Sequence, residues 1–257
     1  MKQLELDQAI DLVQDGTFLG VGGVLLKRKP MRFLADLVRA GRSRLRVATF
    51  LGSVDVELLA AAGALDSFSG GYVGFEYLGF APAFQRAVER SEINYREYSE
   101  FLFMAGLRAA AGGLPFYPAR AALGSDLVAE LGLSVIADPY GGCPVVAVPP
   151  LTPEVAVIHA EVADTFGNVA APSFPDFLVD FDVALARAAG AVIVTAERVV
   201  ERLDVPAQIF GFQVTAVVET RGGARPSGVP GRYPPDVVAI RRYLTQPNLD
   251  SLLEAVG

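Results

Sequence analysis

The sequence predicts an α/β fold, built as a three-layer, open and mostly parallel sheet with helices on both faces. Helical and extended patterns alternate along the 257 residues, as expected when each strand is followed by a crossover helix. Several extended patterns are continuous valine-rich runs rather than alternating ones, which indicates strands covered on both faces. No internal repeat or disordered linker interrupts the alternation, so we expect one domain over residues 1–257.

The first half of the chain predicts short strands that alternate with helices. Asp7 can cap a first helix, which Gly16 ends, and Pro30 suits the first turn of a later helix, which Gly41 follows. The apolar residues of these helices recur at helical spacing. The predicted strands cover residues 17–21, 45–51, 68–73 and 93–98, and the helices after them cover residues 30–40, 56–62, 83–90 and 101–111.

The second half continues the alternation with strands that are richer in valine. The predicted strands cover residues 145–148, 155–159, 191–195 and 214–219. Residues 221–235 are rich in Gly, Pro and Arg, and this composition predicts a mobile loop. Two helical patterns follow, at residues 236–244 and 249–256, and we expect them to dock as a C-terminal cover.

Composition and charge exclude several classes of protein. The net charge of −7 argues against general nucleic-acid binding, which needs a basic surface. The N-terminus lacks a signal-peptide pattern, and no apolar stretch approaches the roughly 20 residues that span a bilayer, so we expect no membrane association. Cys143 is the only cysteine, so no intrachain disulfide can form. These features together predict a cytoplasmic protein.

The first candidate site is the string Gly20-Val21-Gly22-Gly23, at the end of the first predicted strand. Glycines let the backbone approach a ligand closely and present N–H groups to an anion or to a developing oxyanion. Open α/β sheets bind their ligands at such strand ends. The alternative is a plain tight turn.

A basic stretch follows these glycines. Lys27, Arg28 and Lys29 begin a run up to Arg46 that holds eight basic residues and a single acid, Asp36. This run can form a locally positive site for an anionic ligand. The alternative is that its side chains are solvated faces of a helix and a loop.

The second candidate site is Tyr98-Ser99-Glu100, at a predicted strand-to-helix junction. Serine and glutamate are ordinary residues at the start of a helix, so a cap is one explanation. The functional alternative is that Glu100, held at the carboxyl end of a strand, acts as a nucleophile or as a general base.

The third candidate site is His159, followed by Glu161, Asp164 and the turn Gly167-Asn168. His159 is the only histidine, so no histidine-based metal cluster exists, and the spacing suggests no Ser–His–Asp triad. A lone histidine that ends an apolar strand most often has a structural role. We therefore expect no metal site and no tightly bound cofactor.

Taken together, these strings resemble the α subunit of family I CoA transferases, of the glutaconate CoA-transferase type. The matching strings run in family order from about residue 5 to residue 220 and cover nearly the whole chain. They are Gly22-Gly23, Arg28-Lys29-Pro30-Met31, Tyr98-Ser99-Glu100, Gly106-Leu107-Arg108-Ala109-Ala110, Leu114-Pro115-Phe116, Leu123-Gly124-Ser125-Asp126, and His159 with Ala163-Asp164 and Gly167-Asn168.

The resemblance implies an enzyme that moves CoA between an acyl-CoA and a carboxylic acid through a glutamyl-CoA intermediate, with coenzyme A as substrate. In two-subunit members the catalytic glutamate lies in the β subunit, in a Ser-Glu-Asn-Gly-like string that this chain lacks. The resemblance therefore implies a heteromer with a β-type subunit. It also makes Gly20, Gly22 and Gly23 oxyanion or CoA contacts, and lets Lys27, Arg28 and Lys29 contact CoA phosphates.

A second branch of the same family implies a different role for this chain. In the related hydrolase that opens a ring of steroid-derived CoA thioesters, the catalytic glutamate belongs to the α-type subunit, where it takes the position that corresponds to Glu100. This correspondence makes Glu100 the best catalytic candidate. A non-catalytic ligand-binding or scaffold subunit is the alternative of another class, because the same broad fold occurs in sugar-phosphate isomerases and in effector-binding domains.

Overall fold

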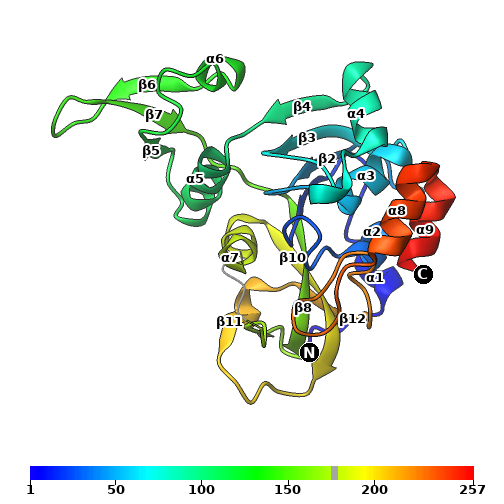
Figure 1. Cartoon of the computed structure of the whole chain (residues 1–257). Helices are drawn as coiled ribbons and strands as arrows, with labels where there is room; N and C mark the ends of the chain where they lie inside the picture. The colour runs from blue at the N-terminus through cyan, green and yellow to red at the C-terminus, as the bar shows by residue number, and fades with distance from the viewer. Residues whose placement is uncertain (175–178) are drawn as a thin grey trace.

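The central element of the fold is a parallel sheet, which confirms the predicted fold class (Figure 1). The computed structural model describes residues 1–174 and 179–257. Within these residues, parallel strands lie in the order β12-β10-β8-β1-β2-β3-β4. Their bounds are β1 Phe18–Val21, β2 Leu45–Ala48, β3 Leu65–Gly70, β4 Asn94–Glu97, β8 Val155–Asp164, β10 Ala191–Val200 and β12 Ala216–Glu219.

Helices cover both faces of this sheet. Successive residues of β8 point into different cores, with Val155 and Val157 in one and Ala156 and Ile158 in the other. The first core is covered by α1 (Leu6–Ile10), α2 (Met31–Arg39), α3 (Val54–Ala61), α4 (Pro82–Glu89), α8 (Val237–Thr245) and α9 (Leu249–Val256). The second core is covered by α5 (Glu100–Ala111) and α7 (Val179–Ala188), on the other side of the sheet in Figure 1.

The two C-terminal helices form the predicted cover. Helix α9 packs on α2 and α3, and α8 packs on α9. The Tyr243 hydroxyl of α8 donates to the buried Glu57 carboxylate of α3, which also accepts from the Ala83 and Phe84 N–H groups of α4. None of the described helices is both long enough and apolar enough to cross a membrane.

The first helix begins at a different cap from the predicted one. Helix α1 has Glu5 as its N-cap, and the Glu5 N–H donates to Gln8 Oε1 at 3.1 Å. Asp7 lies inside its first turn instead. The other predicted helices and strands of the first half are present, with ends that shift by a few residues.

A second, antiparallel sheet was not predicted. Strands β5 (Tyr117–Ala119), β7 (Pro144–Val148) and β6 (Ser134–Ala137) pair in that order, and α6 (Leu127–Glu130) precedes β6. We call residues 117–148 the arm, which projects from the body in Figure 1. The prediction that residues 145–148 form a strand of the parallel sheet is wrong, because this run pairs antiparallel with β5 and β6. The short strands β9 (Val169–Ala170) and β11 (Ala207–Ile209) extend the main sheet near the end of β8.

Residues 221–235 are fastened to the body instead of forming the free loop that their composition predicts. The Gly228 N–H donates to the Leu26 carbonyl at 2.8 Å, and the Gly228 carbonyl accepts from the Arg28 N–H at 2.8 Å. Ala224, Ser227 and several neighbours are buried. This segment therefore covers the loop that follows β1.

Candidate functional site

The candidate residues lie along one edge of the main sheet, where the parallel strands end. Gly22 and Gly23 follow β1, and Glu100 follows β4. Strand β4 lies three places from β1, and neighbouring strands are about 4.8 Å apart, so these strand ends are separated by about 14 Å. The fold therefore brings the candidates to a common edge but not into contact.

The glycines within and just after β1 allow close packing and a tight turn. A Cβ atom on Gly20 would lie 2.6 Å from Leu185 Cδ1, and Gly23 has a φ of +71°. The Gly22 N–H donates to the Val157 carbonyl at 2.8 Å, and the Gly23 N–H donates to Asp182 Oδ1 at 2.8 Å. Oxyanion binding at Gly22 or Gly23, the role that the resemblance implies, would require these hydrogen bonds to break.

Arg28 and Lys29 are buried in ion pairs beneath the glycine turn. Arg28 Nη2 lies 3.0 Å from Asp182 Oδ2, and Lys29 Nζ lies 2.8 Å from Asp55 Oδ2. Lys29 Nζ also donates to Thr49 Oγ1 at 3.0 Å. Burial lowers the pKa of Lys29, and the charge of Asp55 opposes that change. Both side chains hold the turn from inside the fold, so neither presents its charge to a CoA phosphate in this structure.

Lys27 differs from its two neighbours because it faces a cavity. The cavity has a volume of about 390 Å³ and lies between the loop after β1 and the fastened segment 221–235. Among the described residues, none forms a hydrogen bond or ion pair with the Lys27 ammonium group. The lining residues are Leu26, Lys27, Glu76, Gly228, Pro230, Gly231, Arg232, Tyr233, Pro234 and Pro235.

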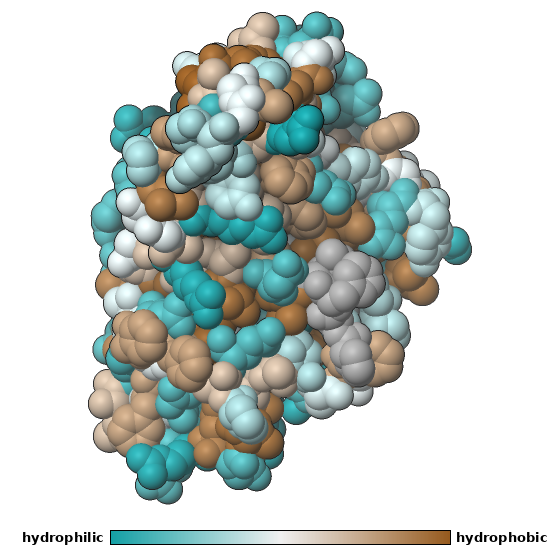
Figure 2. Space-filling view, turned by 90° about the vertical axis from the view of Figure 1, so that its left-hand side faces the viewer, coloured by the Kyte–Doolittle hydropathy of each residue, from teal (hydrophilic) through white to brown (hydrophobic). Residues whose placement is uncertain are grey.

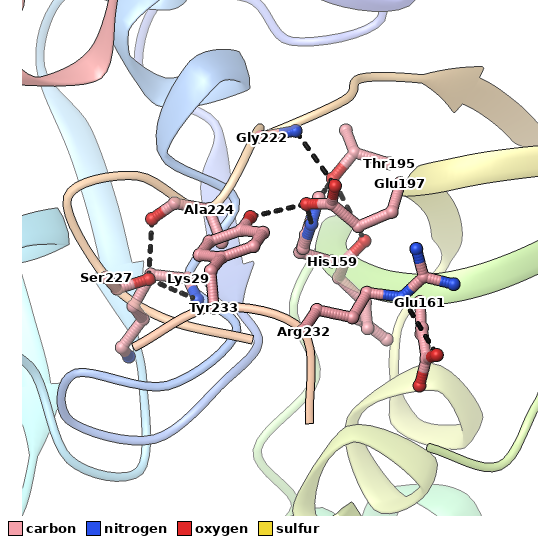
Figure 3. Close-up of polar contacts among 11 residues, drawn as sticks. Lys29, His159, Glu161, Thr195, Glu197, Gly222, Ala224, Ser227, Arg232 and Tyr233 are labelled. Atoms are coloured by element: carbon pink, nitrogen blue, oxygen red, sulfur yellow. Dashed lines mark hydrogen bonds and ion pairs between the residues drawn. The ribbon is translucent and has the colours of Figure 1, made fainter. Parts of the chain in front are cut away.

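His159 belongs to a buried hydrogen-bond network that the sequence did not predict (Figure 3). His159 Nε2 lies 2.9 Å from Glu197 Oε1, and its Nδ1 lies 2.9 Å from Thr195 Oγ1. The Tyr233 hydroxyl also donates to Glu197 Oε1, and the Gly222 N–H donates to Glu197 Oε2 at 2.8 Å. The network joins β8 and β10 to segment 221–235, so His159 has a positioning role, in line with the structural alternative.

The network fixes the charge of Glu197. Burial by itself would raise the pKa of this carboxyl, but the hydrogen bonds from His159, Tyr233 and the Gly222 N–H lower it to about 2. Burial and the neighbouring Glu197 carboxylate raise the pKa of Tyr233. Glu197 is therefore an anion at neutral pH, and Tyr233 is a neutral donor held against it.

A second contact fastens the same segment to the end of β8. Arg232 Nε lies 2.8 Å from Glu161 Oε1, and Glu161 Oε2 accepts from the Ser173 N–H at 2.8 Å. Burial opposes ionisation of Glu161, but the bonds from Ser173 and Arg232 lower its pKa. Figure 3 shows Arg232 and Tyr233 reaching from the segment toward their separate carboxylates.

Glu100 is exposed at the first residue of α5. The cap interpretation is confirmed for Ser99, whose Oγ accepts from the Leu102 N–H at 3.3 Å. Within the described part of the chain, the Glu100 carboxylate makes no hydrogen bond or ion pair. It is thus available to a ligand or to another protein, and its catalytic role stays a prediction.

Two further observations concern metal-binding side chains and the single cysteine. Across residues 1–174 and 179–257, no three His, Cys, Asp or Glu side chains are grouped in a way that could hold a metal ion. Cys143 is exposed in the turn between β6 and β7, away from the strand ends described above.

The sequence and the fold together identify the family of this chain. Residues 4–219 match the family profile described as coenzyme A transferase. This match covers well over half of the chain, which therefore belongs to the coenzyme A transferase family.

Individual relatives have names that refer to different reactions. The chain is 34% identical to the cholesterol ring-cleaving hydrolase IpdA subunit of Rhodococcus jostii over 238 residues, covering 87% of this chain and 79% of the relative. The solved structure of the decarboxylase AibA/AibB matches with a TM-score of 0.91 and 32% identity, covering 99% of this chain and 98% of that one. The glutaconate coenzyme A-transferase structure from Acidaminococcus fermentans matches with a TM-score of 0.87 and 26% identity, covering 100% and 93% of the two chains.

The share of each relative's length that this chain covers differs among the matches. The chain spans only 55% of an uncharacterised Archaeoglobus fulgidus protein, to which it is 34% identical over 255 residues. By contrast, it spans 79% and 82% of two relatives that are themselves single subunits, the IpdA chain and the α-type chain of glutaconate CoA-transferase. These matches support assignment of this chain as an α-type subunit of the family.

Proposed function

We propose that the chain is the α-type subunit of a heteromeric enzyme that acts on CoA thioesters, with Glu100 as the carboxylate that it contributes to catalysis. The observation that carries this proposal is the position of Glu100 in a coenzyme A transferase family chain. It lies at the carboxyl end of a parallel strand, exposed and unpaired among the described residues. Ligands of open α/β sheets bind at this edge.

The first candidate reaction is CoA transfer. A glutamate carboxylate attacks the thioester carbonyl, and the CoA thiolate leaves as an acyl–glutamyl anhydride forms. The thiolate then attacks the glutamyl carbonyl, which releases the acyl group as a carboxylate and leaves a glutamyl-CoA thioester. An incoming carboxylate repeats the two steps in reverse, so CoA passes to the new acid and the glutamate is restored.

The second candidate reaction is hydrolysis. The chain's 34% identity to the ring-cleaving hydrolase IpdA subunit favours it. In this case Glu100 either activates a water molecule or attacks the substrate directly, and no carboxylic acid acceptor is needed. The likeness to a protein named as a decarboxylase adds release of CO₂ as a third product to be measured.

A partner subunit is part of the proposal. The arm exposes hydrophobic side chains on strand β6 and on the turn after it, among them Val135, Ile136 and Tyr140. Figure 2, which views the molecule from the side of the arm, shows hydrophobic side chains gathered at the top and hydrophilic ones across the middle. Exposed apolar groups on a projecting sheet are a common feature of protein interfaces. Two relatives are named as parts of multi-chain enzymes, which supports the same interpretation.

The test is Glu100→Gln in the chain co-expressed with its partner subunit. The proposal predicts a loss of thioester turnover of about 100-fold or more, because removal of a general base or nucleophile has at least this effect. Glu97→Gln is the matched control, since Glu97 is also exposed and lies three residues earlier. Near-full activity of the Glu100→Gln complex would eliminate this residue as the catalyst.

The same assay separates the candidate reactions in the unsubstituted complex. Labelled carboxylic acid that becomes acyl-CoA indicates transfer. Free CoA without labelled acyl-CoA indicates hydrolysis, and CO₂ that accompanies an intact, shortened acyl-CoA indicates decarboxylation. A complex that processes no thioester with any acceptor would contradict the proposed function as a whole.

A further inference from the structure

We propose that the 390 Å³ cavity beside Lys27 binds an anionic group of the thioester substrate, with the Lys27 ammonium as its charged contact. This inference rests on the proposed function, because it assigns part of that substrate to a place in the fold. The anionic group is either a carboxylate on the acyl chain or a phosphate of CoA, and the two share the same chemistry toward an ammonium.

The charge around the cavity favours an anion at Lys27. Two cations and one carboxylate, Glu76, line the cavity; Glu76 is exposed to solvent, and Arg232 is already paired with Glu161 at 2.8 Å. Lys27 makes no such contact with any residue that the structure describes. A half-buried ammonium without a counter-ion costs free energy, which a bound anion recovers.

Lys27 is held on a rigid part of the backbone. Its N–H donates to the Val24 carbonyl at 3.0 Å, and its own carbonyl accepts from the Val24 N–H at 3.0 Å. Gly228 bonds to the residues on either side, through the Leu26 carbonyl and the Arg28 N–H. The ammonium is thus carried by a backbone that is already ordered before a ligand binds, which reduces the entropy lost on binding.

Unusual backbone conformations occur at one residue of the cavity lining and at two residues next to it in the chain. Leu25 and Arg28, which flank the Leu26–Lys27 pair, have φ angles of +52° and +53°, and the cavity-lining Glu76 has a φ of +56°. Left-handed conformations at residues other than glycine are unfavourable, and they cluster at ligand sites. Their concentration here supports a binding role for this turn.

The remaining walls suit an apolar chain next to the anionic group. Leu26, Pro230, Pro234 and Pro235 present carbon surface to the cavity. Tyr233 is fixed in its wall by the hydrogen bond to the buried Glu197. A pocket of this size, with mostly apolar walls and the half-buried, unpaired Lys27 ammonium, fits a chain that carries one anionic group.

The position of the cavity is consistent with one substrate that contacts both Lys27 and Glu100. Its lining comes from the loop after β1 and from the segment after β3, together with residues 228–235. Strand β4, which leads to Glu100, is the next strand after β3. A substrate that extends along this edge can therefore reach both Lys27 and Glu100.

The test is Lys27→Met in the complete complex, which removes the charge and keeps an unbranched side chain. The probes are glutaryl and butyryl thioesters of CoA and of pantetheine, and the readouts are KM, kcat and the dissociation constant by titration calorimetry. Arg221→Met is the matched control, because Arg221 is an exposed cation at the start of the same fastened segment but does not line the cavity. Lys27→Arg tests whether charge alone restores binding.

We expect Lys27→Met to raise KM and the dissociation constant about tenfold or more with little change in kcat, and Lys27→Arg to recover most of the loss. A loss with both glutaryl thioesters but neither butyryl thioester identifies the acyl carboxylate as the bound group. A loss with both CoA thioesters but neither pantetheine thioester identifies a CoA phosphate. Unchanged constants for all four probes would overturn the inference while leaving the proposed function intact. The calorimetric readout applies even to a complex that turns over no thioester.

Discussion

The buried pair of Lys29 and Asp55 shows how single residues support the candidate site. Both side chains are fully buried, and Lys29 also bonds to Thr49 at the end of β2. Placing two charges in the core is unfavourable unless they stay paired. The pair therefore serves to hold the β1 turn against β2 and the start of α3.

We predict that Lys29→Met lowers the free energy of unfolding by about 3 to 5 kcal/mol, because it leaves the Asp55 carboxylate buried without a counter-charge. Chemical denaturation at pH 7 measures the change. Lys29→Met combined with Asp55→Asn should recover most of the loss, since the second substitution removes the stranded charge. A single substitution that costs less than about 1 kcal/mol would show that the pair contributes little.

Glu197 gives a prediction about pH. Its pKa is lowered from 4.5 to about 2 in the folded chain, so its ionised form stabilises the fold. This stabilisation is fully present above pH 4.5 and is lost as the pH falls toward 2.

We therefore expect Glu197→Gln to lower the free energy of unfolding by about 2 to 3 kcal/mol at pH 7. The difference between the original and substituted chains should shrink progressively below pH 4.5. Urea denaturation of both chains at several pH values from 7 to 3 measures it. A difference that stays constant over this range would contradict the role given to the network.

At the scale of elements, the arm projects from the body and leaves one of its strands uncovered (Figure 1). All residues of β6 are exposed, although β6 pairs with β7. By contrast, Val146 and Val148 of β7 are buried in the second core, so the arm is anchored through β7 while β6 is left uncovered. The arm thus has the physical character of an element that becomes buried in an assembly.

We predict that Ile136→Ser with Tyr140→Ser weakens binding of the partner subunit by about tenfold or more while leaving the fold of this chain unchanged. Loss of apolar surface from an interface has this effect on the dissociation constant. Sedimentation of the mixed subunits measures association, and circular dichroism checks the fold. Val238→Ser is the control, because Val238 is an exposed residue on α8, outside the arm. Equal weakening by both changes would remove the arm from the interface.

The sequence predicted the main sheet well because its signals are local. Apolar spacing, Pro30 and the strand-end glycines each report on a few neighbouring residues, and those elements were found. The arm was missed because the valine run at residues 145–148 has the same local pattern whether its strand pairs parallel or antiparallel. Strand partners depend on residues far away in the chain, as with β5 and β7.

The candidate site was predicted only in part for the same reason. The sequence singled out Lys27 and Glu100, but it could not distinguish Lys27, which lines a cavity, from Arg28 and Lys29, which are buried. The partners of these two, Asp182 and Asp55, are contacts between separate elements. The sequence did not single out Glu197, because no local pattern marks a glutamate within a strand. Its role in the hydrogen-bond network depends on His159 and Tyr233, which the fold brings beside it.

At the scale of the whole molecule, the chain supplies part of a candidate active site, at the edge where the parallel strands end. The glycine turn, the Lys27 cavity and Glu100 lie along that edge, and the network around Glu197 fastens the segment that covers it. Glu100 has no partner within the part of the chain that the structure describes. We propose that a second subunit completes the site around this carboxylate.

The most direct test of this claim is to identify the glutamate that becomes covalently modified. The co-expressed complex is incubated with acyl-CoA, the thioester or anhydride is reduced with borohydride, and the altered residue is located by peptide mass spectrometry. We predict modification at Glu100, or, if Glu100 only activates water, no trapped residue together with the loss of activity in Glu100→Gln. Modification of a glutamate in the partner subunit, with Glu100→Gln fully active, would contradict the claim.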